Sequence, residues 1–190
     1  MSMRFDPGVN DEVLFGRNVL LERDMCTMTV EFFMKGDASS SVAYAPLLHF
    51  NVGKSMSDAT IWSVRYIDDN GSLGVRVDSD IGDAGVNQYV NAVGTAVDDG
   101  CWHHVAVTFE AVEGNTKTEV KIYKDYEVVS SKTLNGLLKA KDVAETSLSV
   151  GSTSYAGLID EVRISKGVLG VSEMLHAARN PNAGFLLTVY

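Results

Sequence analysis

Short segments of alternating apolar and polar residues, separated by turn signals, run through most of this chain. The clearest is Thr60–Ile67, which leads into the turn signal Asp68-Asp69-Asn70-Gly71. Strand side chains alternate between two faces, so such a segment predicts a strand with one face buried. The predicted strands cover 28–35, 47–52, 60–67, 73–77, 87–93, 101–110, 119–123, 127–134, 147–151 and 157–165, with a shorter candidate at 19–21. Their spacing is typical of a sandwich or barrel, and we expect an all-β, antiparallel, two-sheet sandwich.

A helical pattern occurs once, near the C-terminus. Ser172 stands as an N-cap ahead of the apolar Met174 and Leu175, and Pro181 follows as a stop. Ser is a favoured N-cap, and Pro cannot continue a helix. The sequence therefore predicts one short helix over residues 172–179.

Length and charge narrow the class of protein. The chain has 190 residues, so we expect a single domain over 1–190, as a module with flanking domains in a longer protein. Its formal net charge of −9 excludes a sequence-independent grip on nucleic acid or anionic lipid, which needs clustered Lys and Arg. The sequence holds no apolar run long enough for membrane insertion.

The two cysteines leave two states open. Cys26 and Cys101 could form a disulfide if folding brings their Cα atoms within about 7 Å. The other state is two buried or half-buried thiols, which behave as small apolar side chains. A domain of this size does not need a disulfide to hold its core together.

The segment Gly157–Ser165 carries charges in the middle of a strand pattern. Regular alternation would place Asp160 on one face with the apolar Leu158, Val162 and Ile164. An ionised carboxylate among core residues needs a partner, because its unpaired burial would raise its pKa. A metal ion, a basic side chain or backbone donors could each be that partner.

Three of these segments together resemble the laminin-G-like, concanavalin A-like lectin/glucanase superfamily. They are Thr29-Val30-Glu31-Phe32, Asp99-Gly100-Cys101-Trp102-His103-His104-Val105-Ala106 and Ile159-Asp160-Glu161-Val162-Arg163-Ile164. The resemblance spans roughly residues 10 to 175 and implies a jelly-roll sandwich. One position departs from the family, whose Asp-Gly hairpin turn here is Asp125-Tyr126. Tyr tolerates positive φ poorly, so we expect a longer or different turn.

The resemblance also implies a structural calcium ion. In lectin- and glucanase-like sandwiches, an Asp at the place of Asp160 can bind calcium together with oxygen donors near the N-terminus, for which Asp6 or Asp11 is the candidate. The alternative is that Asp160 accepts backbone hydrogen bonds or an ion pair and binds no metal. The acidic, glycine-containing loop Asp78–Gly85 is a second, weaker calcium candidate, since it lacks the order of an EF-hand.

Two further polar pairs have structural explanations. Glu31 and Arg163 each point away from the apolar residues of their strands, so on neighbouring strands they would form a cross-strand ion pair. His103 and His104 suggest zinc binding or catalysis at first sight. Alternation points their imidazoles to opposite faces, so they cannot bind one metal from a regular strand.

A carbohydrate-binding face can be assembled from three consecutive predicted strands. Its members are Trp62, Tyr66, Arg76, Tyr89 and Asn91. Aromatic rings pack on the C–H faces of sugars, while amide and guanidinium groups bond their hydroxyls. The alternative is that Trp62 and Tyr66 face the core, with Ser63 and Arg65 outside.

Three classes of function compete. The first is a non-catalytic recognition module for a glycan or protein ligand, serving a secreted or cell-surface protein, as the resemblance implies. The second is a structural or protein-interaction module. The third is a glycoside hydrolase or lyase, for which the retaining glucanases of the superfamily need paired carboxylates, commonly Glu-x-Asp-x-x-Glu. The sequence has no such string, since Thr27 stands at the last position after Glu22 and Asp24.

Overall fold

The computed structural model describes residues 2–6, 13–15, 26–38, 41–52, 60–77, 87–138, 146–175 and 188–189. Most of these residues are in strands. The strands are β1 (Met3–Phe5), β2 (Val13–Phe15), β3 (Met28–Gly36), β4 (Pro46–Val52), β5 (Thr60–Tyr66), β6 (Ser72–Val77), β7 (Gln88–Ala96), β8 (His103–Val112), β9 (Lys117–Lys124), β10 (Glu127–Asn135), β11 (Thr146–Val150), β12 (Gly157–Lys166) and β13 (Thr188–Val189). All ten of the longer predicted strands are confirmed within a few residues, whereas the candidate at 19–21 lies outside the described residues.

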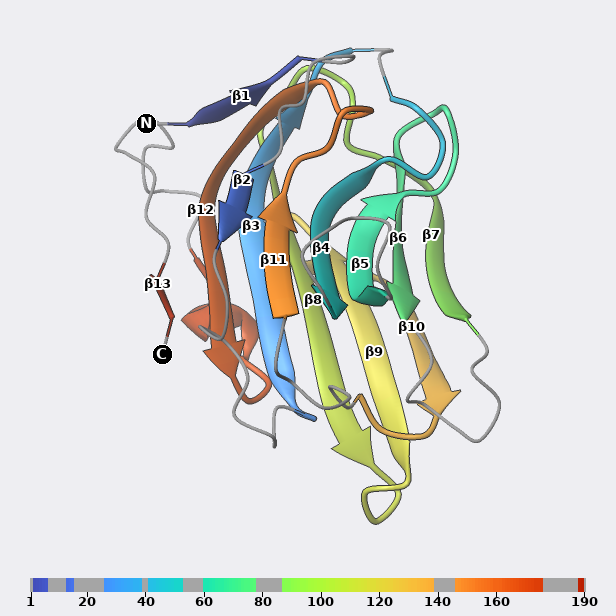
Figure 1. The fold of residues 1–190 in the computed structure, drawn as a ribbon. Helices are drawn as coiled ribbons and strands as arrows, with labels where there is room; N and C mark the ends of the chain where they lie inside the picture. The colour runs from blue at the N-terminus through green and yellow to red at the C-terminus, as the bar shows by residue number, and fades with distance from the viewer. Residues whose placement is uncertain are drawn as a thin grey trace.

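Two sheets lie one over the other (Figure 1). The seven-stranded sheet has the order β1-β12-β3-β8-β9-β10, with β13 paired to β12, and the six-stranded sheet has the order β2-β11-β4-β5-β6-β7. Every pairing is antiparallel except β12 with β13. Strands adjacent in space come from both ends of the chain, as where β12 lies beside β3. The predicted two-sheet antiparallel sandwich is confirmed.

The core fills the space between the sheets. Alternate residues of β3 and β8 face inward, including the fully buried Val30, Phe32 and Val107. From the six-stranded sheet, Trp62 stacks on Phe50 with 5.6 Å between ring centroids. Each such side chain contributes about 1.5–3 kcal/mol when it is fully buried.

One edge of the sandwich is closed by side chains of β10 that reach the edge strand β7. Ser130 Oγ donates to the carbonyl of Asn91 at 2.9 Å, and Lys132 Nζ donates to the carbonyl of Tyr89 at 3.0 Å. These bonds satisfy carbonyl groups that an edge strand would otherwise expose, and they hold the backbone that carries Tyr89 and Asn91.

The hairpin between β9 and β10 corrects the predicted longer turn. Glu127 pairs with Lys124, so only Asp125 and Tyr126 form the loop, and both have positive φ, 50° and 70°. The tyrosine accepts this conformation because its ring and hydroxyl are both held: the ring stacks on His104 at 4.4 Å, and the hydroxyl donates to the carbonyl of Leu175 at 2.6 Å. Tertiary contacts therefore outweigh the local preference for Gly.

Strand β12 is not regular, which corrects the predicted alternation. Its register with β3 shifts between Asp160 and Arg163, and Glu161 has a φ of 48°. This bulge reverses the phase, so Ile159 faces the core before it, and Val162 faces the core after it. Asp160 pairs with Phe33, which alternates with the core residues of β3, and thus lies on the outer face of the sheet.

The predicted helix over 172–179 is wrong at its start. Val171–Glu173 form a single 3-10 turn, and Met174 is already extended, with φ −68° and ψ 161°. Residues 176–179 lie outside the described residues. In the part of the chain that the structure describes, no helix has the length and apolar character of a membrane span.

Candidate functional site

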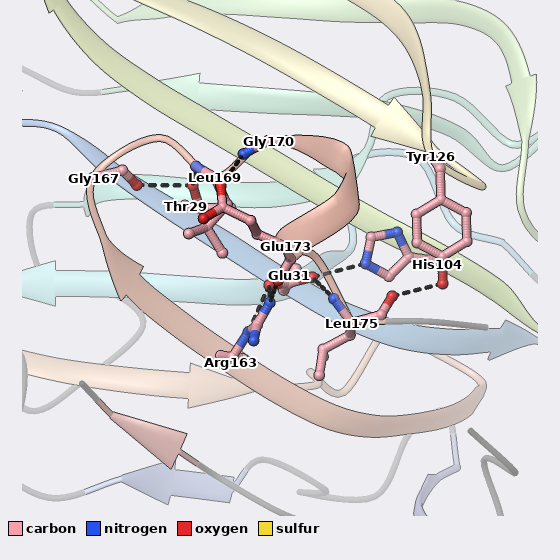
Figure 2. A network of polar contacts seen from close by, with 10 residues as sticks. All are labelled: Thr29, Glu31, His104, Tyr126, Arg163, Gly167, Leu169, Gly170, Glu173 and Leu175. Atoms are coloured by element: carbon pink, nitrogen blue, oxygen red, sulfur yellow. Dashed lines mark hydrogen bonds and ion pairs between the residues drawn. The ribbon is translucent and has the colours of Figure 1, made fainter. Parts of the chain in front are cut away.

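The outer face of the seven-stranded sheet holds a buried polar network beneath the segment 167–175 (Figure 2). The side chain of Glu31 is fully buried and accepts from Arg163 Nε at 2.6 Å, from His104 Nε2 at 3.0 Å and from the Leu175 amide at 2.7 Å. Arg163 also donates to the carbonyl of Glu173 at 2.7 Å. The network therefore ties the C-terminal segment to strands β3, β8 and β12.

The predicted cross-strand pair of Glu31 and Arg163 is confirmed, with the two residues in register. Burial would raise the pKa of Glu31, but hydrogen bonds from His104, Leu175 and Arg163 together hold it below its usual value of 4.5. The resulting stability is present above pH 4.5 and is lost as the pH falls through the lowered pKa of the folded state. These bonds join residues of β3, β8 and β12 to the segment 167–175, so the carboxylate holds these parts of the fold together.

The two histidines point apart, as predicted. His104 contacts Glu31 on the outer face, whereas His103 contacts Asp99 at 3.0 Å and Asp125 at 2.7 Å. His103 thus links the turn before β8 to the turn after β9. Neither arrangement places both imidazoles around one metal.

Asp160 and Asp6, the two calcium candidates that the structure describes, do not come together. Asp160 is fully buried, its Oδ1 accepts from the Glu161 amide at 2.9 Å, and burial raises its pKa. In the described part of the chain, its Oδ2 has no hydrogen-bond partner. Phe5 pairs with Gly157, so Asp6 lies about four residues, or about 13 Å, along the pairing from Asp160, too far for one calcium shell.

The described residues do not by themselves fit a calcium site. Among them, no group of three His, Cys, Asp or Glu could hold a metal ion. Asp11 and the loop 78–85 lie outside the described residues, so calcium binding stays a prediction. Cys26 and Cys101 are not joined by a disulfide, and Cys101 is exposed rather than buried.

The outer face of the six-stranded sheet carries a different set of polar residues. Pairing across β4, β5, β6 and β7 aligns His49, Ser63, Arg76 and Tyr89 in one row. His49 and Ser63 are buried, Arg76 is half-buried, and Tyr89 is exposed. Their strand neighbours face the core, so this row is directed away from it.

His49 is neutral in the folded protein at neutral pH. Burial, together with the positive charges of Arg76 and Arg65, lowers the pKa of His49 to about 4. Its Nε2 lies 2.7 Å from Thr60 Oγ1, and its Nδ1 lies 3.4 Å from Asn51 Nδ2. The amide nitrogen can only donate, which places the proton of the neutral ring on Nε2.

A second row on this face contains Arg65, Gly74 and Asn91. The guanidinium of Arg65 lies between two tyrosine rings, 5.1 Å from the centroid of Tyr44 and 5.2 Å from that of Tyr89. Tyr44 is 62% exposed and Tyr89 is 38% exposed, so both rings can be reached from solvent. We call Tyr44, Arg65, Tyr89 and Asn91 the tyrosine–arginine patch.

Position 74, in the middle of this row, has no room for a side chain. A Cβ atom there would lie 2.2 Å from Ile67 Cγ2 and 3.1 Å from Asn91 Oδ1. The absence of a side chain at position 74 therefore leaves room for the side chains of Ile67 and Asn91.

The predicted carbohydrate-binding residues divide between the core and this face. Trp62 is 2% exposed and Tyr66 is 1% exposed, and both belong to the core, which corrects their assignment as ligand contacts. The outer face does carry Arg76, Tyr89 and Asn91. It also carries Arg65, as the alternative with Trp62 and Tyr66 in the core predicted. Tyr44 was missed, because it lies in a turn outside any alternating pattern.

A family model, described as the concanavalin A-like lectin/glucanases superfamily, matches residues 7–174. The chain belongs to this superfamily. The laminin-G-like resemblance is confirmed, and the family match covers all strands from β2 to β12. No curated protein sequence matches this superfamily member significantly.

Solved structures share its fold at low sequence identity. The sialidase module CBM40 of Ruminococcus gnavus bound to α2,3-sialyllactose has a TM-score of 0.60 and 16% identity, over 90% of this chain and 93% of that chain. Mouse laminin α1 domains LG4-5 have a TM-score of 0.57 and 15% identity, over 94% of this chain and 45% of that chain. The SAP-like pentraxin of Limulus polyphemus has a TM-score of 0.56 and 15% identity, over 87% of this chain and 76% of that chain. These similarities show that the superfamily member shares the fold of these proteins.

Proposed function

We propose that the protein is a non-catalytic carbohydrate-binding module whose binding surface is the tyrosine–arginine patch with the adjacent Arg76. The observation that carries the proposal is the pair of solvent-accessible tyrosine rings on either side of Arg65. Aromatic faces pack on sugar C–H groups, and the guanidinium and amide groups beside them supply hydrogen bonds to hydroxyls.

The position of the patch suits an extended ligand. Pairing across β5, β6 and β7 brings Arg65, Arg76, Tyr89 and Asn91 onto one face of the sheet. Contacts from β10 hold the backbone of Tyr89 and Asn91, so these side chains stand on a rigid element. A preformed surface loses less entropy on binding than a flexible one.

A binding role rather than catalysis is supported from two sides. The sequence lacks the Glu-x-Asp-x-x-Glu string of the retaining glucanases of the superfamily. The sialidase module with the same fold is described as bound to sialyllactose, which is a glycan. We further propose an extracellular or cell-surface location, one domain over residues 1–190, and flanking domains in a longer protein.

The second candidate is a protein-interaction module at the same surface. Val93 is 79% exposed on the strand that carries Tyr89 and Asn91, and Val42 is 45% exposed near Tyr44. Apolar side chains beside exposed tyrosines are also typical of protein interfaces.

A glycan array followed by calorimetric titration tests the proposed function. The parent protein is expected to bind at least one glycan class, and Tyr89→Ala is expected to weaken that binding by about tenfold, because loss of a stacked ring costs about 1 kcal/mol or more. Val128→Ala, which alters an exposed strand residue on β10, is the matched control and should bind as the parent does. Absence of glycan binding, or equal binding by Tyr89→Ala, would contradict the proposal.

A further inference from the structure

The described arginines differ in how their charge is compensated. Arg163 lies against the carboxylate of Glu31, and Arg4 lies 2.9 Å from Asp37 and 3.1 Å from Asp6. The groups that act on Arg65 are instead the phenols of Tyr89 and Tyr44 and the like charge of Arg76. Within the described residues, no carboxylate contributes to its environment, although the chain has 25 acidic residues.

Arg65 is also partly withdrawn from water. Its side chain is half-buried, and its Nε is buried with no hydrogen-bond partner in the described parts of the chain. Burial accordingly lowers the pKa of Arg65 from its usual value, although the group stays charged at neutral pH. A guanidinium that has lost water, with no acid beside it among the described residues, is costly in the free protein.

The two rings restrict the plane of the guanidinium. The rings of Tyr44 and Tyr89 lie against the guanidinium, and the Tyr89 hydroxyl accepts a hydrogen bond from it, so the N–H donors on the rest of its edge are left for another group. A planar carboxylate matches this edge in a bidentate arrangement, which is the strongest hydrogen-bonded pairing available to Arg.

Tyr44 is held in an unfavourable backbone conformation to make its contact. Its φ is 68°, in the left-handed region, within a turn closed by a 3.0 Å bond from the Ala45 amide to the Val42 carbonyl. The Ala43 amide also donates to Asp69 Oδ1 at 2.8 Å, which anchors the turn. Such strain persists where the surroundings impose it, and it is common in residues that clamp ligands.

We propose that Arg65 binds the carboxylate of an acidic glycan, so that the ligand of this module carries a uronic or nonulosonic acid residue. This inference rests on the proposed function, since it names the class of sugar for the same surface. Asn91, two strands away in the same row and exposed, would bond a hydroxyl of the same residue. The half-buried Arg76 adds a second positive charge to the face.

Pairs of ligands that differ only in the charge of the carboxyl group separate the effect of that charge from the effect of ligand shape. Trigalacturonate and sialyllactose would each be titrated into the protein beside their methylamide derivatives, which lack the negative charge. The third arm is an oligosaccharide that carries sulfate groups and no carboxylate. Charge-assisted hydrogen bonds are worth about 1.5–3 kcal/mol, so we expect at least one acid to bind roughly 10- to 100-fold more tightly than its amide.

Variants assign the preference to Arg65. Arg65→Gln should bind acid and amide alike, and Arg65→Lys should keep only part of the preference, because Lys lacks the planar fork. Arg4→Gln removes the same charge at a distant, exposed ion pair and should retain the full preference. Melting temperatures of all variants would show that each one is folded.

Each outcome has a distinct meaning. Equal binding of acid and amide by the parent overturns this inference but leaves carbohydrate binding intact. Binding of the sulfated arm alone overturns the carboxylate assignment. A preference that survives in Arg65→Gln overturns the role of Arg65. Failure of the parent to bind any member of the array removes the proposed function itself.

Discussion

The outer face of each sheet carries an arginine, and the surroundings of the two arginines differ. On the seven-stranded sheet, Arg163 lies against the buried carboxylate of Glu31 beneath the C-terminal segment. On the six-stranded sheet, Arg65 lies between two exposed tyrosines, and no described carboxylate acts on it. A charge that is compensated inside the chain stabilises the fold, whereas a charge that is not is available to a ligand. The difference between the two arginines therefore distinguishes the face that holds the buried network from the face that we propose for binding.

The largest effect is expected from breaking the buried network. Glu31→Gln removes the counter-charge of Arg163 and should lower the free energy of unfolding by about 3–5 kcal/mol, because an unpaired buried charge remains. Urea denaturation followed by fluorescence would measure this change. Glu119→Gln, which breaks an ion pair with Lys121 whose side chains are 28% and 32% exposed, is the control and should cost less than about 1 kcal/mol. A loss below that figure for Glu31→Gln would mean that the network does not hold the face together.

The pH dependence of stability reports on the other face. The pKa of His49 is lowered to about 4, from 6.5 in the unfolded chain, so the unfolded state binds more protons between these values. Stability is expected to fall by up to about 3 kcal/mol as the pH drops from 6.5 to 4, at about 1.4 kcal/mol per unit of pKa difference. Unfolding curves across that interval would show the loss, and His49→Gln should show a flatter profile. Parallel profiles of the two proteins would place His49 in contact with water.

A smaller effect is expected at the hairpin that supports the first face. Tyr126→Phe keeps the ring on His104 but removes the 2.6 Å bond from the hydroxyl to the Leu175 carbonyl. The free energy of unfolding should fall by about 1 kcal/mol, as for one hydrogen bond. Hydrogen exchange of the segment 167–175 should speed up in this variant. An unchanged exchange rate there would show that Tyr126 does not hold the segment.

The smallest effect on stability is expected at the proposed binding face. Tyr44→Ala removes an exposed ring from a strained turn, and the free energy of unfolding should stay within about 0.5 kcal/mol of the parent value. The same variant should bind the glycan about tenfold more weakly, since an exposed ring and its contact with Arg65 are lost. Thermal denaturation and calorimetric titration of one preparation would measure both. A marked loss of stability with unchanged affinity would assign Tyr44 to the fold instead.

Alternation of apolar and polar residues predicted the strands and the two sheets. This was possible because the apolar face of a strand can be recognised from the local sequence. It also predicted that Glu31 and Arg163 would meet, since both residues alternate with their immediate apolar neighbours and Arg163 lies after the bulge. The prediction for Asp160 was wrong in direction, because the bulge at Glu161 reverses the phase without a glycine to signal it.

The residues of the proposed binding face were harder to predict. Trp62 and Tyr66 alternate with polar residues on a strand that has apolar side chains on both faces, so the direction of the core could not be decided from that strand. Tyr44 contributes from a turn, where no periodicity operates. Its contact with Arg65 depends on how the turn at 42–45 is anchored by Asp69, which is a tertiary property.

The comparison between the two arginines is tested most directly by chemical denaturation of Arg163→Gln and Arg65→Gln side by side. Arg163→Gln should lose about 3 kcal/mol or more, because Glu31 is left buried without its charged partner. Arg65→Gln should stay within about 1 kcal/mol of the parent, since the lost ring contacts are offset by the lost desolvation of an uncompensated charge. Equal losses in the two variants would contradict the assignment of one face to the fold and the other to recognition.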